Sequence, residues 1–599
     1  MSATAGPAGA VTGTTMAAMV LEAAGSRRAP AIRHKEGGTW QQVGYDQLGR
    51  TVTALARGLI ALGVEPGDRV AVLSQTRPEW TYADFAILCV GAVTVPVYHT
   101  NSPDECRYVL EHSGARVLFC EDADQLAKVE AIRGQMPALE HLIAFTGARD
   151  GALSLEDLRS RGEEVDEGLV HERATAVSHD DLATIVYTSG TTGPPKGCML
   201  THGNLRADLD MVNQRISFPA GTVFFAFLPL AHALTRIVQF IAINGGAEIA
   251  FWQREPKKLV EEVGEVKPTH LPSAPRLFEK IYTAATAKVA EAGGVKEKLF
   301  HWSVGVGRRL RAAEQEGRAP GRLVQAQYAV ADRLVLHKVR DLFGGRVELA
   351  LSGAAPIDPD ILKFFRAAGV YVLEGYGMTE TSAVASVNTI EEHRFGTVGK
   401  PLPGCEVVIA DDGEVLMRGP NIFRGYYANE EATRTDLVDG WLHSGDLGEL
   451  DADGDLRITG RKKDLIITSS GKNITPSNIE NAIRQSRWVS QAVVFGDRRP
   501  YLTALVTLDP DEAGALAEKV DAPRGDMAAL AAHEGVRAEI QKVVDQANQH
   551  FARIEQVKRF AILDRDLTQD DDELTPTLKV KRNVVYDRHA ETFAALYDG

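Results

Sequence analysis

"LATIVYTSGTTGPPKG", residues 182–197, joins an apolar run to a loop of glycines, hydroxyls and one lysine. The run predicts a buried strand, and the glycines after it predict that the strand ends there. The loop leaves backbone amides unobstructed and Lys196 adds a cation, so the stretch predicts an anion site that suits a triphosphate. A flexible surface linker is the alternative for such a cluster, although here a strand leads in and a lysine closes the loop.

The loop differs from a Walker loop, which needs a glycine before its lysine and a hydroxyl after it. Lys196 instead lies between Pro195 and Gly197. Two prolines also prevent the loop from running directly into a helix, so we expect the next helix to start near Thr201. The phosphates would then be held by a mobile loop.

Two later apolar runs end in the same way. "RVELAL" (346–351) precedes "SGAAP", and "GVYVLE" (369–374) precedes "GYGMTE". Because ligands of open α/β sheets bind beyond the carboxyl ends of strands, we expect all three loops to line one crevice.

The order of patterns predicts the fold class. Helical and strand patterns alternate over residues 45–120 and again after 180, which predicts mostly parallel sheets covered by helices. Short strands with glycine turns follow from about residue 400, and a small α/β unit follows a hinge at Gly460. We therefore predict an α/β protein with a disordered start (1–14), a large N-terminal domain with a β-rich subdomain (15–460) and a small mobile α/β C-terminal domain (461–599).

Composition excludes several classes of function. The 599 residues include 66 Lys and Arg against 81 Asp and Glu, and a net charge of −15 argues against nucleic-acid partners. The five cysteines form no CxxC pair, which suits a reducing compartment without structural zinc. The apolar segment 16–25 is too short to cross a bilayer. We expect a cytoplasmic protein and leave open peripheral membrane contact and the choice between monomer and homodimer.

Five segments together carry a family resemblance. They are "YTSGTTGPPKG" (187–197), "YGMTE" (376–380), "HSGD" (443–446), "GRKKDLIITSSGKNI" (460–474) and "LTPTLKVKR" (574–582). Their order and spacing resemble the adenylate-forming superfamily of acyl-CoA synthetases, luciferases and peptide-synthetase adenylation domains. Within it the chain is most similar to long-chain fatty acyl-CoA synthetases, through "PTHLPSAPRLFEKIY" (268–282) and the helical insert that follows.

The resemblance implies Mg²⁺-dependent use of ATP to convert a fatty acid to acyl-AMP, and then transfer of the acyl group to CoA. It places the β- and γ-phosphates against the glycine loop, and a small-residue wall beside the adenine. Tyr376 would stack on adenine, Thr379 would contact the α-phosphate, and Glu380 would hold Mg²⁺ with Thr188. The loop residues are Thr188, Ser189, Gly190, Thr191, Thr192, Gly193 and Lys196, and the adenine residues are Gly353, Ala354, Ala355 and Gly377.

The resemblance also assigns residues to the ribose and the small domain. Asp446 and Arg461 would bind the ribose hydroxyls, Lys463 would be the point about which the small domain rotates, and Gly471 would approach the CoA thiol. A turn-capping role is the alternative for Asp446.

The resemblance aligns Lys579 with the lysine that bridges the acid and the α-phosphate. Lys581 remains the fallback, because Leu578 replaces the glycine that usually precedes this lysine.

His232 would lie beside the acyl carboxylate, with a packed core histidine as its alternative. Relatives that activate amino acids have an aspartate near this position, and "AHALTR" (231–236) has none.

Other signals carry no function. "DADGD" (451–455) has its glycine in the wrong place for a calcium loop and predicts a hairpin turn. The chain contains neither GxSxG nor HExxH, and Cys198 receives no role. Two rivals stay open: a fatty acyl-AMP ligase that loads a carrier protein, and a non-catalytic sensor of nucleotide or acyl-CoA.

Overall fold

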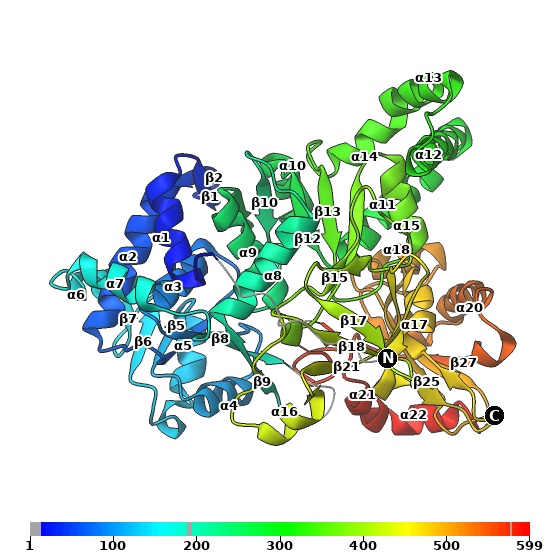
Figure 1. The fold of residues 1–599 in the computed structure, drawn as a ribbon. Helices are drawn as coiled ribbons and strands as arrows, with labels where there is room; N and C mark the ends of the chain where they lie inside the picture. The colour runs from blue at the N-terminus through cyan, green and yellow to red at the C-terminus, as the bar shows by residue number, and fades with distance from the viewer. Residues whose placement is uncertain (1–12, 189–193, 576–577, 599) are drawn as a thin grey trace, which may run out of the picture.

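An eight-stranded sheet forms the N-terminal part of the computed structural model, which describes residues 13–188, 194–575 and 578–598 (Figure 1). Its apolar central strands are buried, as a parallel sheet covered on both faces requires. Helix α2 (Tyr45–Ala61) confirms the helix predicted in this region. The strand order is β19 (Gly425–Tyr426), β9 (Lys196–Thr201), β8 (Leu182–Thr188), β4 (Val93–Val97), β3 (Arg69–Leu73), β5 (Val117–Cys120), β6 (His141–Ala144) and β7 (Leu153–Ser154).

A nine-stranded sheet follows, with a parallel centre and antiparallel strands at both edges. Helices α8 (His202–Arg215) and α9 (Ala233–Gly245) pack on each other, and α9 also contacts β11 of this sheet. The strand order is β16 (Lys400–Pro401), β15 (Ser386–Val387), β14 (Tyr371–Tyr376), β13 (Leu349–Ser352), β12 (His270–Ser273), β10 (Val223–Ala226), β11 (Glu248–Phe251), β1 (Pro30–Glu36) and β2 (Thr39–Gly44).

The three apolar runs singled out in the sequence are strands, but they do not share a sheet. β8 belongs to the eight-stranded sheet, whereas β13 and β14 are neighbours in the nine-stranded sheet. Lys196, which follows the first loop, still lies near the third, because it contacts the Tyr426 ring and Tyr426 is hydrogen-bonded to Glu380. Lys196 therefore belongs to a strand of one sheet, and Glu380 lies just after a strand of the other.

The β-rich subdomain has the predicted antiparallel hairpins. β17 (Glu406–Ile409) pairs with β18 (Glu414–Arg418), and β21 (Trp441–Leu450) pairs with β22 (Leu456–Arg461). Gly413 and Gly454 adopt φ of +87° and +85° at the two bends, a conformation that favours glycine. "DADGD" is the second of these bends, as predicted, since Asp451 and Asp455 are hydrogen-bonded across it.

The C-terminal part contains its own three-stranded sheet and its own buried cluster of apolar side chains. α17 (Pro476–Arg484) and α20 (Glu534–Asn548) pack beside this sheet, and α21 (Arg582–Arg588) follows the segment that carries Lys579. The sheet is β25 (Val489–Phe495), β26 (Leu502–Leu508) and β27 (Val557–Ile562), with β23 (Ile466–Ile467) and β24 (Asn473–Ile474) forming a separate pair.

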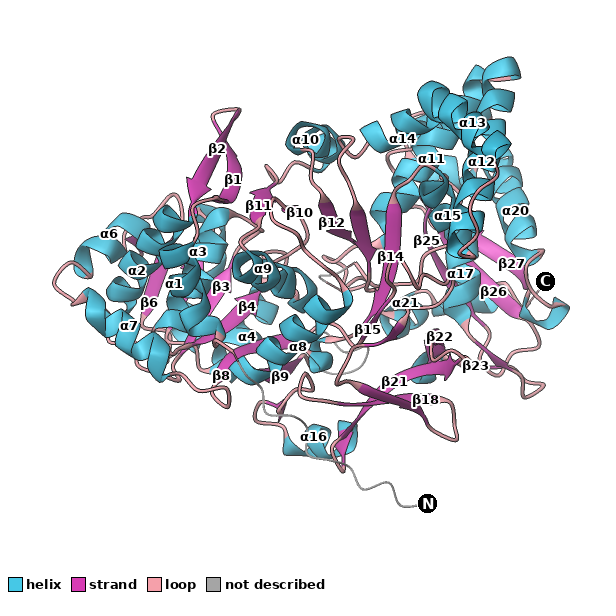
Figure 2. Ribbon diagram, turned by 45° about the horizontal axis from the view of Figure 1, so that its top comes forward, coloured by secondary structure: helices cyan, strands magenta, loops and turns pink. Residues whose placement is uncertain are grey.

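The helical insert begins with α11 (Pro275–Ala292), and α12 (Gly294–Gln315) and α13 (Arg322–Ala331) then form a hairpin. A π-helical segment (Asp332–Leu336) and α14 (His337–Asp341) lead back to the sheet. The hairpin projects beyond the body of the molecule in both ribbon views (Figures 1 and 2).

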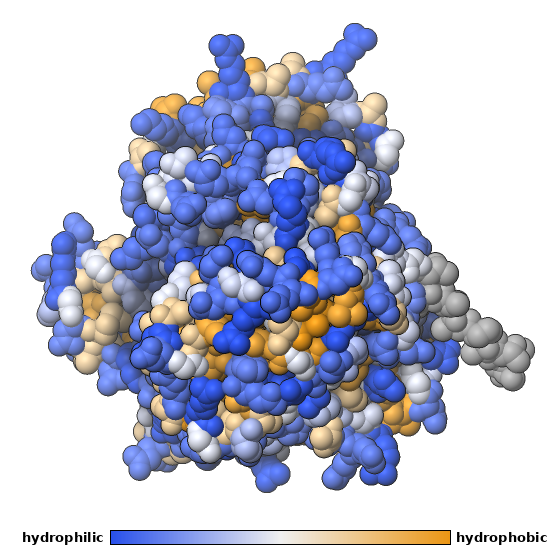
Figure 3. Space-filling model, turned by 90° about the vertical axis from the view of Figure 1, so that its left-hand side faces the viewer, coloured by the Kyte–Doolittle hydropathy of each residue, from blue (hydrophilic) through white to orange (hydrophobic). Residues whose placement is uncertain are grey.

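The start of the chain is anchored at Thr14, whose hydroxyl donates to Glu22 at 2.7 Å. Residues 1–12 of the predicted disordered start lie outside the described residues. Helix α1 (Met16–Ser26) is largely buried, so its apolar residues serve the core. The side of the molecule at the left of Figure 1 is mostly hydrophilic, with apolar side chains gathered near its centre (Figure 3).

Candidate nucleotide and acyl site

The glycine loop connects the antiparallel strands β8 and β9. The hydroxyl of Thr188, the last residue of β8, donates to the carbonyl of Lys196 at 3.4 Å. Thr201 caps α8 through a capping box, so the predicted helix start is confirmed. The assignments to Ser189, Gly190, Thr191, Thr192 and Gly193 lie outside the described residues.

Lys196 and Glu380 lie in one hydrogen-bonded network. The Lys196 ammonium contacts Asp436 Oδ2 at 2.9 Å and lies 4.6 Å from the centre of the Tyr426 ring. The Tyr426 hydroxyl is 2.9 Å from Glu380 Oε1 and 3.0 Å from Asp436 Oδ2. The single phenolic proton of Tyr426 can be donated to only one of the two carboxylates. A further proton or cation beside Glu380 and Asp436 would therefore be stabilised.

Glu380 fits the part of a magnesium ligand. Its side chain is buried in the short helix Thr379–Thr381, and burial raises the pKa of its carboxyl group, so the anion gains from a nearby cation. Magnesium prefers oxygen donors and commonly takes one or two carboxylates plus substrate phosphates. No cluster of three or more His, Cys, Asp or Glu able to hold a metal occurs in the described part of the chain, so phosphates would have to complete the coordination.

A second network joins the residues assigned to adenine and ribose. The Tyr376 hydroxyl donates to Asp446 Oδ2 at 2.8 Å, and Arg461 Nε donates to Asp446 Oδ1 at 3.0 Å. Asp446 and Arg461 are direct partners in the β21–β22 ladder, which explains their approach. Burial lowers the pKa of Arg461, whereas the negative charge of Asp446 and the hydrogen bond to it raise this pKa, and the net shift is upward.

The small residues of the site differ in how far glycine is required. A Cβ on Gly377 would lie 2.1 Å from the carbonyl oxygen of Ala383, so only glycine fits. A Cβ on Gly353 would meet its nearest atom, on Leu234, at an ordinary 3.5 Å. Ala354 is exposed with φ of +70° in the loop after β13, and Ala355 is exposed beside it.

Lys579 reaches the same site from the C-terminal part. Lys579 is exposed to solvent. Protein atoms around its ammonium group nevertheless displace part of the surrounding water, which lowers its pKa, and the Arg461 guanidinium lowers this pKa further. Asp446 and Glu380 oppose the shift, so both networks lie within electrostatic reach of Lys579. The fallback Lys581 instead forms an ion pair with Asp572.

The residue before Lys579 has a backbone conformation that favours glycine. Leu578 adopts φ of +60°. The Thr575 amide donates to the Lys579 carbonyl, and the Lys579 amide donates to the Thr575 hydroxyl. L-residues pay roughly 1–2 kcal/mol in this left-handed conformation, whereas glycine does not. Leu578 therefore holds a conformation that glycine would adopt without this cost.

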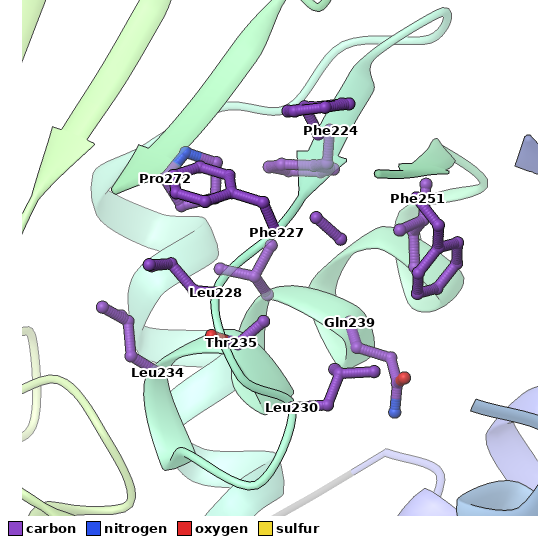
Figure 4. A pocket seen from close by; sticks show the side chains of 13 residues that line it. Phe224, Phe227, Leu228, Leu230, Leu234, Thr235, Gln239, Phe251 and Pro272 are labelled. Atoms are coloured by element: carbon purple, nitrogen blue, oxygen red, sulfur yellow. The ribbon is translucent and has the colours of Figure 1, made fainter. Parts of the chain in front are cut away.

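His232 lies in the chain between Leu230 and Leu234, two residues that line an apolar cavity. It caps α9, and its Nδ1 accepts the Leu234 amide at 3.2 Å, so the neutral ring carries its proton on Nε2. Burial, helped by the charge of Lys579, lowers the pKa of His232 to about 4. The cavity continues past the first turns of α9 between Phe227, Leu228 and Leu234 (Figure 4).

The residues assigned to domain rotation and CoA lie apart from these networks. Lys463 and Gly471 are exposed, and Gly471 forms a turn with φ of +80°. Lys462, between Arg461 and Lys463, contacts Asp412 at 2.6 Å and Glu414 at 3.0 Å. The segment next to the predicted hinge is thus held to the β-rich subdomain.

The small domain also contacts helix α11. Arg276 Nη2 lies 2.7 Å from Asp509 Oδ2, and Lys280 Nζ lies 3.0 Å from Asp511 Oδ2. These ion pairs, together with the position of Lys579, describe an arrangement in which the lysine faces the nucleotide networks.

The fold and these converging loops define a nucleotide-using enzyme of the adenylate-forming class. The model of the AMP-binding enzyme family matches residues 21–427, and the model of the AMP-binding enzyme C-terminal domain matches residues 463–599. The chain belongs to the AMP-binding enzyme family.

Relatives cover nearly the whole chain. It is 41% identical to long-chain-fatty-acid–CoA ligase FadD15 of Mycobacterium bovis, over 94% of this chain and 93% of the relative. It is 32% identical to the peroxisomal long chain acyl-CoA synthetase 6 of Arabidopsis thaliana, over 94% and 82%.

A solved structure of the adenylation domain of a carboxylate reductase from Mycobacterium chelonae shares the fold, with a TM-score of 0.77, 21% identity and coverage of 98% and 92%.

Sequence reasoning missed Tyr426 and Asp436. Tyr426 lies in the short strand β19, and Asp436 ends helix α16 (Glu430–Asp436). Asp436 is 240 residues from Lys196, and nothing in its local sequence marks it. The signal available was the aromatic pair Tyr426–Tyr427 after a glycine, sixteen residues before "HSGD".

Proposed function

We propose that the protein is an AMP-forming fatty acid:CoA ligase that uses ATP and Mg²⁺. The observation that carries this proposal is the approach of Lys196, Glu380 and Asp446 to Lys579, together with an apolar cavity lined by Leu230 and Leu234 on either side of His232 in the chain. The relatives named as long-chain-fatty-acid–CoA ligases support both the acid and the acceptor.

In the first half-reaction an oxygen of the fatty acid attacks the α-phosphorus of ATP, and pyrophosphate leaves. Lys579 holds the acid oxygen and the α-phosphate together, and Lys196 stabilises the charge on the departing phosphates. Glu380 holds Mg²⁺, which neutralises phosphate charge when bound. Nε2–H of His232 orients the second acid oxygen.

In the second half-reaction the CoA thiolate attacks the acyl carbon, and the bond to AMP breaks. Lys579 must withdraw for this step, so the small domain (461–599) rotates against the large domain (15–460) about Lys463. A few residues suffice to absorb such a rotation. Gly471 then lies beside the pantetheine arm, where a side chain would obstruct it.

The cavity favours an aliphatic chain over an amino acid. Aromatic and aliphatic residues from β10, β11 and α9 line it, including Phe224, Phe251 and Val238. Transfer of each buried methylene from water contributes roughly 0.8 kcal/mol, so a longer chain gains affinity until the cavity ends. We propose long-chain acids as substrates and the cytoplasm, with peripheral contact to a membrane left open, as the location of the enzyme.

Two measurements test the function. Purified protein with ATP, Mg²⁺ and palmitate should release pyrophosphate, and free CoA should then yield palmitoyl-CoA. Absence of pyrophosphate with any acid from butyrate to palmitate would leave the sensor as the better reading. Pyrophosphate without acyl-CoA would favour transfer to a carrier protein.

A further inference from the structure

The hairpin formed by α12, α13 and the π-helical segment, residues 294–336, carries large apolar side chains on its outside. A soluble protein rarely gathers such side chains on one projecting element without a partner. The exposed residues are Val295 (82% exposed), Trp302 (38%), Leu323 (72%), Val330 (51%) and Leu334 (43%).

The spacing places these residues in two stripes. Val295, Trp302 and Arg309 recur every seven residues, which is close to two turns of α12. Leu323, Val330 and Leu334 are separated by seven and four residues along the second arm of the helical hairpin, so they also lie on one side of the helix. The opposite side of α12, including Phe300 and Val304, is buried.

A cross-hairpin contact shows that the two stripes adjoin. Arg309 Nη2 lies 3.5 Å from Gln327 Oε1, and Gln327 lies between Leu323 and Val330 on their stripe. Because the two helices run antiparallel, this pairing brings Trp302 opposite Leu334. The apolar residues therefore form one surface rather than two separate ones.

Charge identifies the partner. Residues 294–336 contain eight Lys and Arg against four Asp and Glu, in a chain whose net charge is −15. Three of the four acids are already paired, Glu314 with Arg311, Glu316 with Arg318, and Asp332 with Arg340. The bases without a described carboxylate beside them are Lys296, Lys298, Arg308, Arg309, Arg322 and Arg333.

We propose that this hairpin docks on the surface of an anionic lipid bilayer. Basic side chains beside apolar ones, on a helical face that lies flat, match the two layers of a membrane interface, where cations meet headgroup phosphates and apolar residues enter the acyl boundary. Trp302 suits the interface because its ring is both apolar and able to donate a hydrogen bond. No helix in the described parts of the chain is long and apolar enough to cross a membrane, so the contact is peripheral.

Vesicle flotation tests the proposal on the full chain. The protein should float with vesicles of phosphatidylcholine mixed with phosphatidylglycerol, stay in solution with phosphatidylcholine alone, and detach as salt is raised. The double variant Trp302→Ser/Leu334→Ser should lose about tenfold in vesicle partitioning. The matched control Val408→Ser/Ile554→Ser alters two apolar residues of similar exposure, 41% each, outside the hairpin and should float like the unaltered chain.

Pyrophosphate release with a water-soluble short acid checks that each variant is folded. A second pair, Arg309→Gln/Arg333→Gln, should lose the preference for anionic vesicles. The proposal is overturned if the unaltered chain fails to float, or if the hairpin variants float as well as the control. It is also overturned if light scattering shows that the hairpin variants lose a dimer and vesicles bind nothing.

Discussion

At the scale of single residues, Lys579 is the clearest test of the site. Lys579→Ala should reduce acyl-adenylate formation by about 10²-fold or more, because a charge that forms between acid and phosphate loses its stabilising partner. Thioester formation from supplied acyl-adenylate should continue, since the lysine has left the site by then. Both half-reactions can be followed separately, by pyrophosphate release and by loss of free thiol.

Lys581→Ala is the control, because Lys581 pairs with Asp572 instead. Equal losses in both half-reactions of a folded Lys579→Ala protein would refute the assignment.

Asp436 should compete with the triphosphate for Lys196. The ion pair at 2.9 Å is partly exposed, so its loss is worth roughly 1 kcal/mol or less, and Asp436→Asn should lower KM for ATP by up to about fivefold. Steady-state kinetics with varied ATP measure this. Asp439→Asn, three residues further and exposed, is the control. A raised KM would mean that Asp436 positions Lys196 for the nucleotide instead.

These residues also show where prediction from sequence stops. Lys196, Tyr376, Asp446 and Arg461 belong to motifs that can be identified by their spacing, and the structure brings them to two adjacent networks. Asp436 has no motif, because its partner is 240 residues away and the contact exists only after β19 and α16 have folded beside β9. Tertiary pairs between unlike segments leave no local periodicity.

At the scale of elements, α9 should set the length of the acyl chain. Val238 is buried one turn beyond Leu234 and lines the cavity. Val238→Phe fills this space, so kcat/KM for palmitate should fall about tenfold or more while butyrate is still activated. A panel of acids from short to long measures the shift.

Val260→Phe on α10 (Leu259–Val266), where the side chain is 45% exposed, is the matched control and should leave the preference unchanged. An unaltered palmitate-to-butyrate ratio in Val238→Phe would place the acyl chain elsewhere.

The apolar runs before the three loops predicted strands correctly, since strand propensity and burial are local properties. They did not predict which strands pair, because a buried run with apolar residues on both faces fits any central position of a parallel sheet. The assignment of β8 to one sheet and of β13 and β14 to another therefore came only from the structure. The exposed stripe of α12 likewise could not be predicted from the sequence, because it depends on which side of the helix packs against the rest of the protein.

At the scale of the whole molecule, buried histidines should make the fold sensitive to mild acid. Burial lowers the pKa of His202 to about 3, of His270 to about 4 and of His393 to about 3, from 6.5. The unfolded chain therefore binds more protons between pH 6.5 and these values, so stability is full above pH 6.5 and falls as the pH drops through this window. Thermal unfolding from pH 7.5 to 4.5 should show Tm decreasing with acid.

His393→Gln tests one contribution. Arg366 donates to His393 Nδ1 at 2.9 Å, and a Gln oxygen can accept the same bond without titrating. The variant should lose less Tm between pH 7 and 5 than the unaltered chain. An identical slope would show that His393 does not titrate in this range.

Helix α11 connects the contact with the small domain to the projecting hairpin. Its first two turns carry Arg276 and Lys280, which contact the small domain, and its last residue leads into the projecting hairpin. An enzyme tethered by that hairpin would keep its large domain still, and each catalytic cycle would break and remake the α11 ion pairs. A change in ionic strength would then affect membrane binding and the turnover rate over the same range. A salt titration that measures both quantities would show them changing together.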